Sequence, residues 1–194
     1  MKNGEKSGTL KRFTSKGVFP YQFAFTLLFP LRNIFLSPKE LIHRLMLKDN
    51  FNVLEIGPGP GYFSTKIAKE LTNGKLFLTD IQQEMLDYAK KRIDKQELKN
   101  VEYKLCDGNR LDFENDFFDR VFMVTVIGEV ENKDSYLKEI YRILKSDGIL
   151  SISELAGDPD KLSIDELRGL VASYGFKLEK QFGSNRNYTL NFTK

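Results

Sequence analysis

Short apolar runs alternate along the chain with longer stretches whose apolar residues recur at helical spacing. Five runs rich in apolar or β-branched residues predict buried strands, at residues 51–56, 75–79, 101–105, 120–127 and 148–153. Four amphipathic stretches predict helices, at residues 62–71, 82–93, 135–144 and 164–174. Because strands alternate with helices, we expect parallel strands joined by right-handed crossovers, which is an α/β fold.

The C-terminal end departs from this alternation. Residues 176–182 and 188–192 predict two further strands, and only a short loop containing Gly183-Ser184-Asn185 separates them. A connection this short forms a hairpin, so at least one of the last strands must run antiparallel.

A separate helix is predicted ahead of the first strand. In Ser37-Pro38-Lys39-Glu40, the serine can cap the helix, the proline suits the first helical position, and the glutamate completes a capping box. The single histidine, His43, falls among the polar positions of this helix and is expected on the surface. We therefore place a domain at residues 38–194 and an N-terminal extension at residues 1–37.

The strongest chemical signal is the glycine-rich turn after the first predicted strand, Glu55-Ile56-Gly57-Pro58-Gly59-Pro60-Gly61. Glycine lets a backbone turn sharply and approach a ligand with no Cβ in the way. The spacing is GxGxG, and Tyr62 stands where a dinucleotide-binding fingerprint has its third glycine, so a nicotinamide dehydrogenase is disfavoured. The turn also lacks the Lys-Ser/Thr pair of a nucleoside-triphosphate P-loop.

This turn resembles the first motif of class I S-adenosylmethionine-dependent methyltransferases, and the resemblance extends over residues 38–194. The resemblance implies a Rossmann-like three-layer sandwich with a seven-stranded, mostly parallel sheet and an antiparallel C-terminal strand. The hairpin predicted above agrees with that sheet. The resemblance also implies S-adenosylmethionine as the cofactor and S-adenosylhomocysteine as the product.

The resemblance assigns adenosine-binding roles to residues after the second and third predicted strands. Asp80 matches the acid that binds the ribose hydroxyls, and two hydroxyls with one carboxylate form a charge-assisted pair. Ile81 matches the apolar residue that lies on the adenine ring, and Met85 could extend that surface. Asp107, followed by Gly108, matches the acid that accepts from the adenine amino group. Asp80 could instead cap the next helix, Asp107 could start a turn, and Met85 could be plain core.

The glycine turn and Glu55 match the methionine end of the same site. The resemblance gives Glu55 the methionine ammonium, directly or through water, and a buried carboxylate is costly unless it is paired. Gly57, Gly59 and Gly61 would let the backbone approach the cofactor, although they could also form a plain tight turn.

Two glutamates are candidates for a catalytic base. Glu129 follows Val126-Ile127-Gly128, where many relatives resemble a Leu-His sequence, and Glu154 ends the fifth predicted strand. Either could take a proton from a hydroxyl or a carbon acid, whereas a neutral amine could react without a strong base. A polar residue at a strand end could equally be only a loop residue.

The methyl acceptor is expected to be a small, apolar molecule, and nucleic acid is disfavoured as a partner. No Asn/Asp-Pro-Pro-Tyr sequence follows the fourth strand for methylation of base amines, and no Pro-Cys pair exists for attack on cytosine carbon. The single cysteine, Cys106, is expected to be structural, and it excludes an internal disulfide and a Cys-cluster metal site. No metal is expected, and the low cysteine content fits a reducing, cytoplasmic compartment.

The N-terminal extension is basic and aromatic. Residues 1–50 carry nine Lys/Arg and three Asp/Glu, whereas the whole chain of 194 residues has a net charge of +3. In the resembling family this segment often covers the active site, so an apolar lid is one hypothesis, with Tyr21 expected to contact the cofactor or the acceptor. Residues 11–35 could instead pack on the domain, form a homodimer contact or lie on an anionic membrane surface.

Neither a signal peptide nor a transmembrane helix is expected. The apolar run at residues 18–31 contains two prolines and is shorter than the stretch of about 20 residues that spans a bilayer. The run also lacks a small-residue cleavage signature.

Two other functions stay open at the level of sequence. A non-catalytic, S-adenosylmethionine-binding regulatory protein would keep the cofactor site without transferring a methyl group. An aminopropyl transferase would use the same fold with the decarboxylated cofactor. Methylation of an acceptor would exclude the first, and preference for the carboxylated cofactor would exclude the second.

Overall fold

The computed structural model describes residues 21–22 and 35–194, which include the whole predicted domain. Most of the N-terminal extension lies outside the described residues, so its proposed lid, packing and membrane roles stay predictions. Within the described part, Tyr21 is half-buried.

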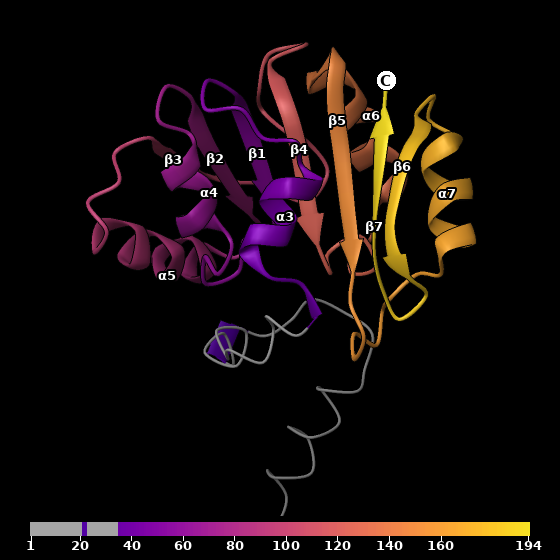
Figure 1. Ribbon diagram of the computed structural model, residues 1–194, viewed down its shortest axis with the longest axis horizontal. Coiled ribbons are helices and arrows are strands. Elements are labelled where there is room, and N and C mark those ends of the chain that lie inside the picture. The colour runs from indigo at the N-terminus through magenta and orange to yellow at the C-terminus, as the bar shows by residue number, and fades with distance from the viewer. Residues whose placement is uncertain (1–20, 23–34) are drawn as a thin grey trace, which may run out of the picture.

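Seven strands form one sheet, in the order β3-β2-β1-β4-β5-β7-β6 (Figure 1). Neighbours among β1 to β5 pair in parallel, whereas β7 pairs antiparallel with both β5 and β6. The strands are β1 (Asn52–Ile56), β2 (Lys75–Asp80), β3 (Val101–Leu105), β4 (Phe118–Val124), β5 (Leu144–Glu154), β6 (Lys177–Ser184) and β7 (Asn187–Thr193). The predicted α/β class, the mostly parallel sheet and the C-terminal hairpin are confirmed.

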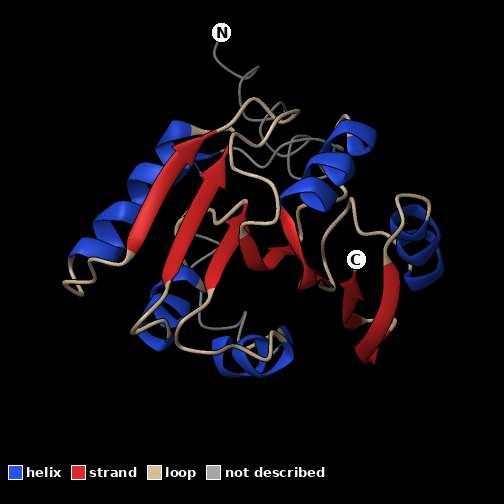
Figure 2. Ribbon diagram, turned by 90° about the horizontal axis from the view of Figure 1, so that it is seen from above, coloured by secondary structure: helices blue, strands red, loops and turns tan. Residues whose placement is uncertain are grey.

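Helices cover both faces of the twisted sheet, which makes three layers (Figure 2). They are α3 (Pro38–Arg44), α4 (Ser64–Glu70), α5 (Gln83–Asp94), α6 (Lys133–Ile143) and α7 (Ile164–Ala172). The apolar stripes of α3, α4 and α5 share one buried cluster with the sheet, and those of α6 and α7 share another on the opposite side. Within the described residues, no helix has both the length and the apolar character needed to cross a membrane.

The predicted capping box fixes the start of α3. The Glu40 amide donates to the Ser37 hydroxyl over 3.2 Å, and the Ser37 amide donates to the Glu40 carboxylate over 3.0 Å. The other end of α3 is tied to the sheet, because the Arg44 guanidinium donates to the Thr189 hydroxyl on β7 over 2.8 Å. His43 is exposed on this helix, as predicted.

The fourth strand ends earlier than its apolar pattern predicts. The sequence predicts a strand over residues 120–127, but β4 ends at Val124. The backbone of Thr125 has φ +55°, a left-handed conformation that cannot continue a strand. The chain therefore leaves the sheet three residues earlier than predicted, and residues 125–127 belong to the loop that follows β4.

Candidate active site

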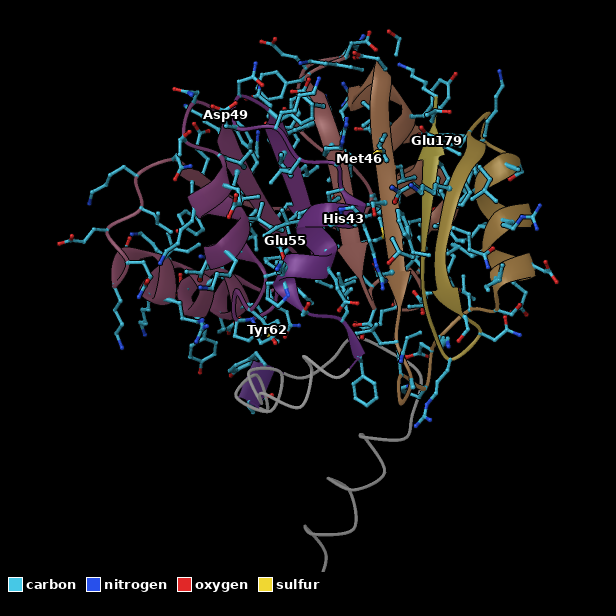
Figure 3. The ribbon with its side chains drawn as sticks, in the orientation of Figure 1. His43, Met46, Asp49, Glu55, Tyr62 and Glu179 are labelled. Atoms are coloured by element: carbon cyan, nitrogen blue, oxygen red, sulfur yellow. The ribbon has the colours of Figure 1, made fainter. Side chains whose placement is uncertain are left out.

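A cavity of about 610 Å³ opens where the parallel strands end. The loops that follow β1, β2, β3, β4 and β5 all contribute to its lining. Successive strands are added in opposite directions on either side of β1 and β4, and ligands of open α/β sheets bind at such a reversal. Glu55 and Tyr62 lie near this edge of the sheet, and Asp49 lies at the opposite edge (Figure 3).

The glycine turn after β1 adopts the left-handed conformations that glycine permits. Gly57, Gly59 and Gly61 have φ values of +65°, +53° and +77°. Gly57 and Gly59 line the cavity, as predicted, whereas Gly61 is not part of its lining. A Cβ on Gly61 would lie 3.1 Å from the backbone of Ala89, so this glycine lets the turn pack closely on α5.

Gly57 is also held by the segments on either side of β1, which are β2 and the loop after β4. Its amide donates to the Thr79 carbonyl over 2.8 Å, and a Cβ added to it would lie 2.6 Å from Cγ2 of Val126. Val126 follows β4, so the loops after β1 and β4 are in direct contact beneath the cavity.

Replacing Gly57 with alanine is expected to weaken cofactor binding by about ten-fold or more, because the left-handed backbone costs about 1–2 kcal/mol and Val126 must also shift. Gly157 provides a matched control, since it has φ +91° and lines the same cavity, but a Cβ there would meet nothing within 4 Å. Titration calorimetry with S-adenosylhomocysteine would compare Gly57→Ala with Gly157→Ala. Equal affinities of the two variants would contradict the steric explanation.

Glu55 is held at the end of β1 and faces the cavity. It is 3% exposed, and its carboxylate accepts a hydrogen bond of 2.6 Å from the Ser64 hydroxyl at the start of α4. Burial of a carboxylate is costly unless it is paired, and this bond meets part of that need. The predicted contact of Glu55 with an ammonium group stays a prediction.

Asp80 ends β2 and borders the cavity beside the glycine turn. The residue is 8% exposed, and its carboxylate accepts a hydrogen bond of 3.0 Å from the Gln82 amide. Burial raises the pKa of Asp80, while the amides of Gln82, Gly59 and Ile81 act to lower it. The carboxylate therefore orders the start of α5 while it borders the cavity, and its ribose-binding role stays a prediction.

The predicted adenine-binding residues gather at one end of the cavity. Ile81 is 44% exposed although it is apolar. Gly108 lies close to it, because a Cβ added to Gly108 would lie 3.5 Å from Cγ2 of Ile81. Met85 also lines the cavity but is 2% exposed, so its side chain lies mainly in the core. Asp107 is exposed, and its carboxylate accepts from the amides of Asn109 and Arg110 over 2.8 and 2.9 Å. These bonds lower the pKa of Asp107. They also show that Asp107 starts a turn, which was the alternative to its predicted contact with adenine.

The two candidate bases occupy different environments. Glu129 lines the cavity in the loop after β4. Glu154 does not line the cavity: its side chain is fully buried at the end of β5, and within the described part of the chain no donor reaches either carboxylate oxygen in regular hydrogen-bond geometry. Burial, followed by the charge of Asp158, raises the pKa of Glu154 to about 8, although the Leu162 amide and Lys161 lower it. Glu154 is therefore enclosed and apart from the cavity lining, and its role as a base stays a prediction.

Several residues that the sequence did not single out also form the site. Tyr136 on α6 reaches the cavity, and its hydroxyl lies 3.9 Å from the Cys106 sulfur. The loops after β3 and β4 are joined by the Asn132 side chain, which donates to Asn109 over 3.2 Å. Tyr136 lies within the predicted helix at residues 135–144, where an aromatic residue is typical of a buried helix face. The sequence pattern therefore gave no indication that Tyr136 lines the cavity.

The loops after β4 and β5 form one continuous wall. A Cβ on Gly128 would lie 2.1 Å from the Asp160 carbonyl oxygen, so the two backbones are in contact. Lys133 binds the same loop after β4 and donates to the carbonyls of Gly128 and Val130 over 3.1 and 2.6 Å. In the order of strands in the sheet, β1 separates this wall from the loop after β2, which carries Ile81, and from the loop after β3, which carries Asp107.

Residues 47–182 match the sequence profile of a protein family described as a methyltransferase domain. The chain belongs to this family. This match confirms the predicted membership of the class I S-adenosylmethionine-dependent methyltransferases. The predicted cofactor, S-adenosylmethionine, is confirmed with it.

Relatives and solved structures agree with this assignment. The methyltransferase domain is 33% identical over 138 residues to the ubiquinone/menaquinone biosynthesis C-methyltransferase UbiE of Neisseria gonorrhoeae, which covers 71% of the chain and 54% of the relative. It is 25% identical over 144 residues to UbiE of Coxiella burnetii, which covers 73% of the chain and 56% of the relative. The chain thus spans little more than half the length of these curated relatives. The crystal structure of a SAM-dependent methyltransferase from Aquifex aeolicus matches the fold with a TM-score of 0.85 at 23% identity, over 90% of this chain and 98% of that one.

The charged side chains that line the cavity of the methyltransferase domain are all acidic within the described residues. They are Glu55, Asp80, Asp107, Glu129, Glu131, Asp158 and Asp160. No lysine, arginine or histidine of the described part joins them. A cavity with this lining suits a ligand with positive charge and opposes one that carries phosphates.

Proposed function

We propose that this methyltransferase domain transfers a methyl group from S-adenosylmethionine to a small molecule with an apolar body. The observation that carries the proposal is the acidic lining of the cavity around the glycine turn. S-adenosylmethionine has a sulfonium and an ammonium, which acidic side chains attract, whereas the pyrophosphate of a dinucleotide would be repelled. The same lining also suits the decarboxylated cofactor of an aminopropyl transferase, so the test must include that molecule.

The residues of the cavity fit this cofactor from one end to the other. Asp80 would take the ribose hydroxyls, Ile81 would lie on the adenine, and Glu55 would face the methionine ammonium. Gly57 and Gly59 both line the cavity with left-handed backbones, so the turn presents main chain rather than side chains to a ligand. When bound, the cofactor supplies a methyl group on a positively charged sulfur, which needs no covalent intermediate with the protein.

The acceptor would occupy the end of the cavity bordered by the loops after β4 and β5. Apolar side chains there alternate with the acidic ones and could hold the body of the acceptor; they are Phe35, Val126, Val130, Leu155 and Pro159. Holding acceptor and cofactor in reactive geometry can lower a barrier by up to about 7–11 kcal/mol. Glu129 is the candidate for the group that takes a proton from the acceptor, since Glu154 is enclosed.

The relatives agree with this class of acceptor. The UbiE proteins are named for C-methylation in ubiquinone and menaquinone biosynthesis. Carbon acids and phenols need a base when they are methylated, which fits a carboxylate at the acceptor end. Because the chain spans little more than half of those relatives, we propose their class of chemistry here and leave the individual acceptor to the screen below.

Titration calorimetry tests the proposal with four ligands: S-adenosylmethionine, S-adenosylhomocysteine, decarboxylated S-adenosylmethionine and NAD. We expect the first two to bind and NAD to give no heat. Methyl transfer is then sought with phenolic and quinol acceptors, in wild type and in Glu129→Gln. Tighter binding of the decarboxylated cofactor would favour aminopropyl transfer, and binding without transfer to any acceptor would favour a regulatory protein. Absence of binding to both sulfur ligands would overturn the proposal.

A further inference from the structure

Thr125 has an unusual backbone at the wall of the cavity. Four non-glycine residues in the described part of the chain have positive φ, namely Met46, Glu97, Asp116 and Thr125, with φ of +55° at Thr125. Thr125 alone among these four lines the cavity, and it alone is β-branched. Left-handed conformations are strongly disfavoured for β-branched residues, and such strain persists where the surrounding structure fixes it.

Three contacts hold Thr125 in this conformation. Its amide donates to the Ser153 carbonyl on β5 over 2.8 Å, which continues the strand pairing by one residue. Its hydroxyl donates to the Val124 carbonyl over 2.7 Å, which closes the turn on itself. The next residue, Val126, packs against the glycine turn, where a Cβ on Gly57 would lie 2.6 Å from its Cγ2.

These contacts connect the strained residue to the cofactor site. If Thr125 continued β4 in an extended conformation, Val126 would follow the strand and would leave the Gly57 turn. The left-handed backbone instead directs Val126 toward Gly57, so the loop after β4 supports the loop after β1. The positions of Thr125 and of the Gly57 turn, which both line the cavity, are therefore set by one local conformation.

We propose that Thr125 is a positioning residue, whose left-handed backbone presses Val126 against the Gly57 turn and so holds the cofactor cavity in its binding shape. The inference rests on the proposed function only in taking this cavity as the site of S-adenosylmethionine. A glycine at this position would relieve the strain and would also release the turn, since glycine reaches many other conformations. Stability and ligand affinity should therefore change in opposite directions.

The test compares Thr125→Gly with Glu97→Gly. Glu97 has φ +57° but is exposed and is not part of the cavity lining, so it reports the relief of the same backbone strain away from the site. We expect both variants to keep or raise the Tm of the free protein. We expect S-adenosylhomocysteine affinity to fall about ten-fold in Thr125→Gly alone, and Thr125→Ser, which keeps the hydroxyl, to stay within about three-fold of wild type.

The outcomes separate this inference from the proposed function. A wild-type protein that binds neither S-adenosylmethionine nor S-adenosylhomocysteine would overturn the proposed function. A wild type that binds, together with a Thr125→Gly variant of unchanged affinity, would overturn the role of Thr125. An affinity that falls only in step with a lower Tm would also overturn it, because that pattern indicates a merely structural residue. If Thr125→Gly does not fold, Val126→Ala tests the same coupling, since it removes the side chain that contacts the Gly57 turn and leaves Thr125 unchanged. Unchanged affinity in that variant would overturn the inference.

Discussion

Replacing Asp80 with alanine is expected to weaken binding of S-adenosylmethionine by about 100-fold while the domain stays folded. A charge-assisted hydrogen bond contributes about 1.5–3 kcal/mol, and the two ribose hydroxyls offer two of them, so a loss of about 3 kcal/mol is a conservative expectation. Asp80 is positioned for this role, because it is 8% exposed at the end of β2 and lines the cavity. Calorimetric titration of the wild type and of Asp80→Ala with S-adenosylmethionine would measure the affinity.

The structural role of Asp80 must be separated from its role in binding. Its carboxylate also accepts from the Gln82 amide, and loss of such a cap costs about 1 kcal/mol of stability. Asp80→Asn keeps an oxygen for that amide but removes the charge, so we expect near-normal Tm with most of the affinity lost. Asp87→Ala, which removes an exposed acid from α5, is the control for a change of net charge. Wild-type affinity in Asp80→Ala would remove the adenosine assignment of this end of the cavity.

The architecture could be predicted because it depends on patterns that are local and repeated. Burial on both faces of a parallel strand requires a continuous apolar run, so β1 and β2 are visible from composition alone. The end of β4 could not be predicted in the same way. Residues 125–127 continue its apolar pattern, yet Thr125 turns away from the strand and the next residue, Val126, contacts Gly57, which lies 69 positions away in the chain. Periodicity contains no information on such a contact.

The site likewise contains residues that the sequence pattern reveals and residues that depend on long-range packing. Residues proposed to contact the cofactor through backbone or at strand ends, such as Gly57 and Asp80, have a motif spacing that the sequence displays, and both line the cavity. Glu154 has the same position at a strand end, but its environment depends on how residues 155–162 fold over it. Tyr136 and Thr125 reach the cavity only because distant elements pack as they do. The chemistry of the cofactor end was therefore predictable, whereas the acceptor end required the structure.

Glu154 gives the second prediction, which concerns the dependence of stability on pH. An ordinary glutamate has a pKa near 4.5, whereas burial and Asp158 raise that of Glu154 to about 8. The folded state therefore keeps this proton at pH values where the unfolded chain has released it. The contribution of Glu154 to the free energy of unfolding should be greatest below pH 4.5, fall as pH rises through the window from 4.5 to about 8, and level off above it. The total loss is on the order of 5 kcal/mol, at about 1.4 kcal/mol for each pH unit.

Glu154→Gln removes the titration and keeps the shape of the side chain. We expect this variant to lack the decline between pH 5 and 8, and so to be more stable than wild type at pH 8 while matching or falling below it at pH 5. Urea unfolding at a series of pH values measures the difference directly, and Glu70→Gln, an exposed glutamate on α4, controls for the loss of one carboxylate.

The groups that face Glu154 determine how the result is interpreted. Asp158 and Glu129 repel its charge from the loops after β5 and β4, Lys161 attracts it, and Tyr188 lies beside it on β7. Parallel stability profiles for wild type and Glu154→Gln would mean that the pKa of Glu154 in the folded protein lies near the ordinary value, so that water reaches the carboxylate. That result would contradict the enclosed environment of Glu154 and would restore it as a candidate base. A decline confined to wild type would instead agree with that environment and leave proton transfer to Glu129.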